Sequence, residues 1–144
     1  MENFNTVIYN NNNYSLYVNS NIIYVDIIDG TYVKENFLEL VEYFKNFWIL
    51  VSNTVDKYHQ VFIFNNVKIY PFEFYDIVFN TLKGLENIFI KHLHSTCLIN
   101  DSNALDIFRP LLNMYKAVRP FRFVKTKEEC EEFLKKNINE DMLV

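Results

Sequence analysis

Along the chain, apolar residues first follow the spacing of β-strands and then the spacing of an α-helix. Residues 14–18 place apolar side chains at every second position, and residues 22–28 are β-branched and nearly continuous, which predicts two strands joined by an Asn-rich turn. Residues 33–51 repeat apolar side chains at i, i+3, i+4 and i+7, from Phe37 to Trp48, as an amphipathic helix does. The chain therefore changes from strand to helix just after Gly30.

The middle of the chain repeats this change. Residues 58–64 are almost uninterruptedly apolar, which predicts a central strand covered on both faces. After Pro71, a residue type favoured at the first position of a helix, apolar side chains from Phe74 to Leu93 keep a helical spacing with a break near Gly84. Residues 95–99 predict the next strand.

The last third predicts helix, strand and helix. Residues 101–115 have a helical spacing in which Pro110 marks a kink or the effective start, and residues 120–124 predict a strand. Thr126 and Glu129 form a capping box that opens the final helix. The predicted fold class is α/β, with a mostly parallel, mixed sheet that opens with a β-hairpin in the order β-β-α-β-α-β-α-β-α. We expect residues 1–144 to form a single domain, with residues 1–13 as a flexible or strand-forming extension.

Composition limits the class of partner and the compartment. Half of the residues are hydrophobic and 17% are aromatic, which indicates a globular chain, and the net charge of −4 argues against nucleic acid as a partner. The first residues lack the pattern of a signal peptide, and two cysteines give no disulfide framework, so we expect an intracellular, cytoplasmic location. The abundance of Asn, Ile, Phe, Tyr and Lys is typical of an A/T-rich genome.

Motifs for chemistry are sparse. His92, His94 and Cys97 are too few to predict a zinc site, and a chain whose only glycines are Gly30 and Gly84 has no phosphate-binding loop. Cys97 lies on a predicted strand, Cys130 on a predicted helix and His59 before a strand, so none of them lies on a turn that would present a nucleophile. We therefore expect no enzyme activity, no cofactor and no metal. The 14 Phe and 10 Tyr residues exceed what a core of this size needs, so aromatic side chains are expected at an interface.

The order of elements and two local patterns resemble the STAS-like fold of bacterial anti-sigma factor antagonists, over roughly residues 14–134. In that family a strand ends in Gly before the first helix, as IIYVDIIDG does at residues 22–30. Residues 107–134, IFRPLLNMYKAVRPFRFVKTKEECEEFL, are similar to the family's late helix, strand and terminal helix. The pattern is apolar and degenerate, so the resemblance implies a fold more than a function.

In those antagonists a D-S-S-G-L segment opens the second helix, and its second serine is phosphorylated to break the contact with a kinase. Residues 71–75, PFEFY, lie at that place here, so the phosphoacceptor is absent and Glu73 takes the serine position. The resemblance implies a non-enzymatic interaction or regulatory module that binds another protein at this corner. The partner-binding residues would be Tyr70, Phe72, Glu73 and Tyr75. Self-association through a strand edge or an aromatic patch is left open.

A second reading comes from the related CRAL-TRIO proteins, which share the sheet and add helices that roof a lipid cavity. A small apolar groove in this chain would accept a hydrophobic ligand, and Arg119 and Arg122 would contact an anionic head group. A chain of 144 residues has little material for such a roof, so lipid or membrane contact is not favoured. A closed, ligand-sized apolar cavity would support the lipid reading, and a solid core with an aromatic surface near Pro71 would support protein binding.

Overall fold

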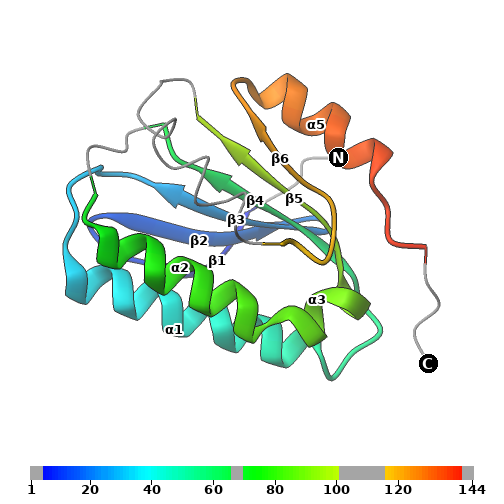
Figure 1. Cartoon of the computed structure of the whole chain (residues 1–144), viewed down its shortest axis with the longest axis horizontal. Helices are drawn as coiled ribbons and strands as arrows, with labels where there is room; N and C mark the ends of the chain where they lie inside the picture. The colour runs from blue at the N-terminus through cyan, green and yellow to red at the C-terminus, as the bar shows by residue number, and fades with distance from the viewer. Residues whose placement is uncertain (1–4, 66–69, 101–115, 141–144) are drawn as a thin grey trace.

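Six strands form one sheet in which neighbours in space are also neighbours along the chain, in the order β1-β2-β3-β4-β5-β6 (Figure 1). The computed structural model describes residues 5–65, 70–100 and 116–140. The strands are β1 (Thr6–Asn10), β2 (Tyr14–Asn19), β3 (Ile22–Ile27), β4 (Tyr58–Ile63), β5 (Leu93–Ile99) and β6 (Phe121–Val124). The described helices are α1 (Lys34–Val51), α2 (Phe72–Gly84), α3 (Glu86–His92) and α5 (Lys127–Lys136).

The sheet is antiparallel at its start and parallel afterwards. β1 pairs with β2 and β2 with β3 in antiparallel fashion, whereas β3, β4, β5 and β6 pair in parallel. Short turns join the antiparallel strands, and α1 forms the connection from β3 to β4. The predicted α/β class, with a mixed and mostly parallel sheet that opens with a hairpin, is confirmed.

The first strand adds to the predicted order. Residues 6–10 pair with β2, so this part of the N-terminal extension is a strand. The Asn-rich run between the two strands is an ordered turn, because Asn11 Oδ1 accepts hydrogen bonds from the backbone N–H groups of Asn13 at 2.8 Å and Tyr14 at 2.9 Å. These hydrogen bonds show that the asparagines stabilise the turn, a role that the composition of the chain did not reveal.

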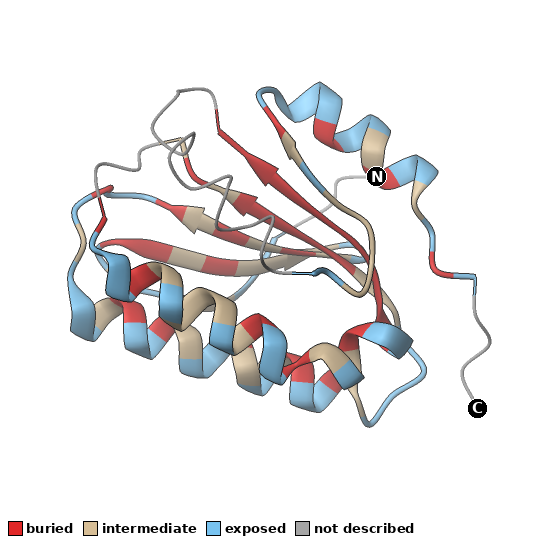
Figure 2. Ribbon diagram, in the orientation of Figure 1, coloured by how far each residue is buried: buried red, intermediate tan, exposed pale blue. Residues whose placement is uncertain are grey.

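Helices α1, α2 and α3 lie on one face of the sheet, called here the inner face, and α5 lies on the other, the outer face (Figure 1). Each helix turns its exposed side away from the sheet (Figure 2). Between the inner face and its helices is the larger core, which includes Leu16, Ile23, Trp48, Phe74 and Phe89, all fully or almost fully buried. The smaller core under α5 consists of Val61, Cys97, Ile99, Val124, Cys130 and Leu134.

Helix ends follow the sequence signals closely. α1 begins at Lys34, one residue later than predicted, and the break near Gly84 separates α2 from α3. Pro71 is the N-cap of α2 rather than its first residue, with ψ of 158°, because the chain is still extended there. Thr126 caps α5 by accepting a hydrogen bond from the Glu129 N–H at 3.1 Å. The helix predicted for residues 101–115 lies outside the described residues.

Candidate functional site

The starts of α1 and α2 meet at one end of the sheet, where strands β3 and β4 end (Figure 1). Lys34 Nζ lies 2.6 Å from Glu73 Oε1, so an ion pair joins the first turns of the two helices. Two apolar side chains flank this pair in sequence and are exposed, Val33 at 38% and Phe72 at 64%. We call Val33, Lys34, Phe72 and Glu73 the corner patch.

The four predicted partner-binding residues do not all face outward. Phe72 and Glu73 are exposed, and Glu73 lies in the first turn of α2, where its negative charge is favourable beside the helix N-terminus. Tyr70 is only 4% exposed, because its ring packs edge-on against Phe74 at 4.5 Å, and Tyr75 is half-buried. Tyr70 therefore belongs to the core beneath the corner and is not available to a partner. Val33, which the sequence analysis did not single out, lies at the surface.

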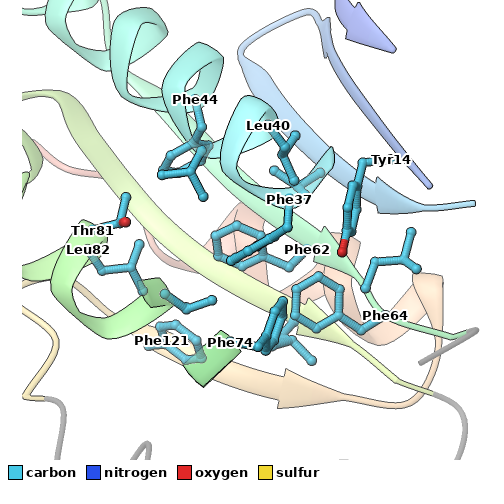
Figure 3. A pocket seen from close by; sticks show the side chains of 15 residues that line it. Tyr14, Phe37, Leu40, Phe44, Phe62, Phe64, Phe74, Thr81, Leu82 and Phe121 are labelled. Carbon is cyan, nitrogen blue, oxygen red and sulfur yellow. The ribbon is translucent and has the colours of Figure 1, made fainter. Parts of the chain in front are cut away.

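A small apolar cavity lies in the larger core, between the inner face and helices α1 and α2 (Figure 3). Its volume is about 60 Å³. Phe37, Leu40 and Phe44 line it from α1, Phe74 and Leu82 from α2, and the remaining side chains come mostly from the sheet. Ligand pockets for drug-sized molecules measure roughly 300–1,000 Å³. The cavity is thus apolar, but it admits only a few heavy atoms.

Three tyrosine hydroxyls gather near the same end of the core. Tyr32 and Tyr70 are 5.3 Å apart between ring centroids, and burial, followed by the neighbouring Tyr70 hydroxyl, raises the pKa of Tyr14 far above its usual range. Among the described residues, none of the Tyr14, Tyr32 and Tyr70 hydroxyl oxygens has a hydrogen-bond partner of regular geometry. Buried hydroxyl groups usually have a hydrogen-bond partner. These three hydroxyls therefore form an unusual polar cluster at the edge of an apolar core.

The two arginines predicted to contact an anionic group lie in different surroundings. Arg122 is on the outer face, where its guanidinium carbon lies 5.3 Å from the centroid of the Phe133 ring. It lines a surface groove together with Glu129, Glu132 and Lys136, so the groove carries charges of both signs. Arg119 lies before β6 and acts electrostatically on His94. The structure gives these residues no common site among the described part of the chain.

A buried polar network, which sequence reasoning missed, crosses the start of β4 and β5 on the outer face. His59 Nδ1 lies 2.7 Å from Ser95 Oγ, and the rings of His59 and His94 are 4.6 Å apart. The backbone N–H of Asn139 donates to His94 Nδ1 at 2.8 Å, which ties the segment after α5 to the sheet. Burial, and then His94, lowers the pKa of His59 to about 4, so the network is neutral at pH 7.

The cysteine and histidine residues considered for chemistry are accounted for by packing. Cys97 and Cys130 are free and buried against each other in the smaller core. A hydrogen bond with Cys130, together with burial, raises the pKa of Cys97, which disfavours a reactive thiolate there. His92 Nδ1 lies 2.9 Å from the carbonyl oxygen of Asp56. Within residues 5–65, 70–100 and 116–140, no three His, Cys, Asp or Glu side chains are grouped as metal ligands would be.

The described helices include none with the length and apolar character needed to cross a membrane. No protein-family model matches the sequence, and no curated protein matches it. Among solved structures, the crystal structure of Sfh5 is similar with a TM-score of 0.44 and 16% sequence identity, over 70% of this chain and 42% of that chain. This chain thus spans less than half the length of that protein. A likeness of this size supports no conclusion about function, and the resemblance to the STAS-like family stays a prediction.

Proposed function

We propose that this chain is a non-enzymatic protein-interaction module whose partner docks on the corner patch. The observation that carries the proposal is the exposure of Phe72 beside the Lys34–Glu73 ion pair, at the end of the parallel strands. In open α/β sheets, binding sites are found at the carboxyl ends of the strands. Large exposed aromatic side chains next to fixed charges are typical anchors of protein interfaces.

The packing below the patch supports this role. Phe74 contacts the rings of Tyr70 and Phe37 at 4.5 and 4.6 Å, so the first turn of α2 rests on a dense aromatic support. A surface held in this way needs little ordering when a partner binds, which favours affinity. In the resemblance to the STAS-like antagonists, Glu73 takes the serine position, so it would give the patch a permanent negative charge in place of a regulated one.

The test compares two exposed apolar residues at opposite ends of the inner-face helices. Phe72→Ala should lose the partner in affinity purification from the native source, whereas Leu50→Ala, at a site that is 70% exposed near the end of α1, should retain it. Purified wild-type and variant chains would then be titrated with the identified partner. Equal affinity for wild type and Phe72→Ala would contradict the proposal.

A charge exchange sharpens the same test. If the partner reads the sign of the charge on each helix, the double variant Lys34→Glu with Glu73→Lys will stay defective although its ion pair is restored. If only the ion pair matters, the double variant will bind like wild type, and the partner would then depend on Phe72 and the intact pair but not on which helix carries which charge.

A second candidate function is the binding of a small hydrophobic ligand in the core cavity. The apolar lining of the cavity favours a molecule with an apolar body. The cavity volume of about 60 Å³ makes this the weaker candidate, because the core would have to expand around the ligand. Native mass spectrometry of the purified chain, with extraction of co-purified lipids, tests it directly.

A further inference from the structure

The outer face of the sheet is only partly covered. Helix α5 packs on β5 and β6, and the smaller core under it reaches Ile22 and Tyr24 of β3, but no described helix lies over the outer face of β1 and β2 (Figure 1). One row of residues in register crosses this open part: Val7 pairs with Tyr17, and Tyr17 pairs with Tyr24. The row continues to Val61, which is buried in the core under α5. Val7, at the far end of the row, is 55% exposed.

The two tyrosines of this row form a stacked aromatic pair, in which each ring covers one face of the other. Their ring centroids are 4.9 Å apart with an interplanar angle of 14°, so the rings are stacked. Both side chains are half-buried. A groove of about 230 Å³ runs from these rings to α5 and includes Ile63, Lys127 and Glu131. The open part of the sheet thus has an aromatic surface beside a hollow.

An acidic side chain stands next to these rings without a partner. Asp26 follows Tyr24 by two residues, so it is on the same face of β3, and it is half-buried. Among the described residues it makes no ion pair and no side-chain hydrogen bond, and the Ser15 hydroxyl opposite it donates to Asn10 Oδ1 instead. Burial raises the pKa of Asp26, and burial followed by Asp26 raises that of Tyr17 to about 12.

We propose that Asp26, Tyr17 and Tyr24 form a receptor for an arginine side chain, presented by a basic segment of a partner protein. The planar guanidinium group stacks on aromatic rings and donates two parallel hydrogen bonds to a carboxylate, so one group satisfies both features of this surface. The chain uses the first of these contacts itself, where Arg122 lies over the Phe133 ring.

The net charge favours a basic partner protein over the other occupants. The chain carries a net charge of −4, which attracts a basic segment at long range, whereas the groove beside the rings carries both signs of charge, from Lys125, Lys127 and Glu131. Lysine is a less suitable occupant than arginine, because its ammonium group is strongly hydrated and cannot bond a carboxylate in two places. A second copy of this chain is also a less suitable source of the arginine. Among its described arginines, Arg122 already lies over a ring of its own chain, and Arg119 is half-buried.

The test uses the whole chain and a short acetylated, amidated peptide of Gly and Ala with one central arginine. The control peptide carries citrulline in place of arginine, which keeps the shape and removes the charge. Binding is followed by NMR through the signals of Tyr17, Tyr24 and Asp26. The arginine peptide should saturate these signals, and the citrulline peptide should bind about tenfold more weakly or worse.

Two substitutions place the effect at the receptor. Asp26→Asn should reduce binding of the arginine peptide to the level of the citrulline peptide, and Asp76→Asn, at an exposed acidic residue of α2, should leave it unchanged. Phe72→Ala should also leave it unchanged, so this test is independent of the corner patch. If Asp26→Asn does not fold, Tyr17→Leu removes the aromatic surface while keeping its apolar character, and the same loss is expected.

Three results would overturn the proposal. Equal binding of the arginine and citrulline peptides would show that the charge is not recognised. Guanidinium ion or spermidine that bound as tightly as the peptide would show a site for a small cation rather than for a protein segment. Concentration-dependent dimerisation in light scattering, abolished by Asp26→Asn, would show that a second copy is the occupant.

Discussion

The inner and outer faces of the sheet differ in what covers their apolar surface. Three of the described helices cover the inner face, and the core beneath them contains the only tryptophan and many of the phenylalanines of the chain. One of the described helices, α5 with ten residues, covers part of the outer face, above a smaller core that holds both cysteines. Next to that helix lie a buried histidine pair at one end of the strands and the half-buried tyrosines of β2 and β3.

This difference separates stability from recognition. Burial of large aromatic side chains is the dominant source of folding free energy, and it is concentrated on the inner face. The outer face contributes less apolar burial and carries groups that a closed core would exclude, such as the carboxylate of Asp26. We therefore expect substitutions on the inner face to unfold the chain and most substitutions on the outer face to change local structure or binding.

The largest expected effect comes from removing an inner-face ring. Phe74→Ala should lower the free energy of unfolding by about 3–5 kcal/mol, because it leaves a cavity among rings that also face the existing hollow. Leu134→Ala, in the smaller core, should cost about 2–3 kcal/mol. Urea unfolding followed by circular dichroism measures both. Equal losses at the two sites would remove the distinction between the faces.

Acid should lower the stability of the chain through a histidine on the outer face. The pKa of His59 is lowered from 6.5 to about 4, so between these pH values the unfolded chain binds a proton that the folded chain does not. Stability should therefore fall as the pH drops from about 6.5 to about 4, by about 2–3 kcal/mol for this residue. The measurement is urea unfolding at pH 7 and pH 4.5. His59→Gln, which cannot be protonated, should lose this part of the pH dependence, and an unchanged slope would exclude His59 as its source.

The smallest expected effect is at the start of α5. Thr126→Ala removes the side-chain oxygen that accepts from the Glu129 N–H, and should cost about 1 kcal/mol. Hydrogen exchange should show faster opening of the α5 amides, while the amides of the inner-face helices stay as protected as in wild type. Thr126→Ser keeps the hydroxyl and serves as the control. A uniform increase over both faces would mean that α5 unfolds only together with the whole sheet.

Sequence patterns predicted the helices and strands in which apolar residues recur at a regular spacing. α1, β4 and the capped start of α5 were found almost to the residue, because periodicity and capping are local properties. β1 was left open between strand and flexible extension, because a short edge strand flanked by asparagines has a weak pattern.

The candidate site was less predictable, for physical reasons. Tyr70 and Phe72 are neighbours of similar character around Pro71, and only the three-dimensional path of the corner decides that one is buried and the other exposed. Asn139 has no recognisable pattern, yet its side chain donates to the carbonyl oxygens of Ile90 and Leu93, both at 3.1 Å. The half-buried state of Tyr17 and Tyr24 depends on how far α5 reaches over the sheet, which no strand pattern encodes.

The strand order bears on how the chain folds as it is made. Because each strand pairs with the strand before it, the sheet can grow by addition at one edge while synthesis proceeds from the N-terminus. No strand has to insert between two others that are already paired. During synthesis the last paired strand always has a free edge, so a nascent chain paused before β6 would expose β5, and a chaperone that binds extended segments would find it there.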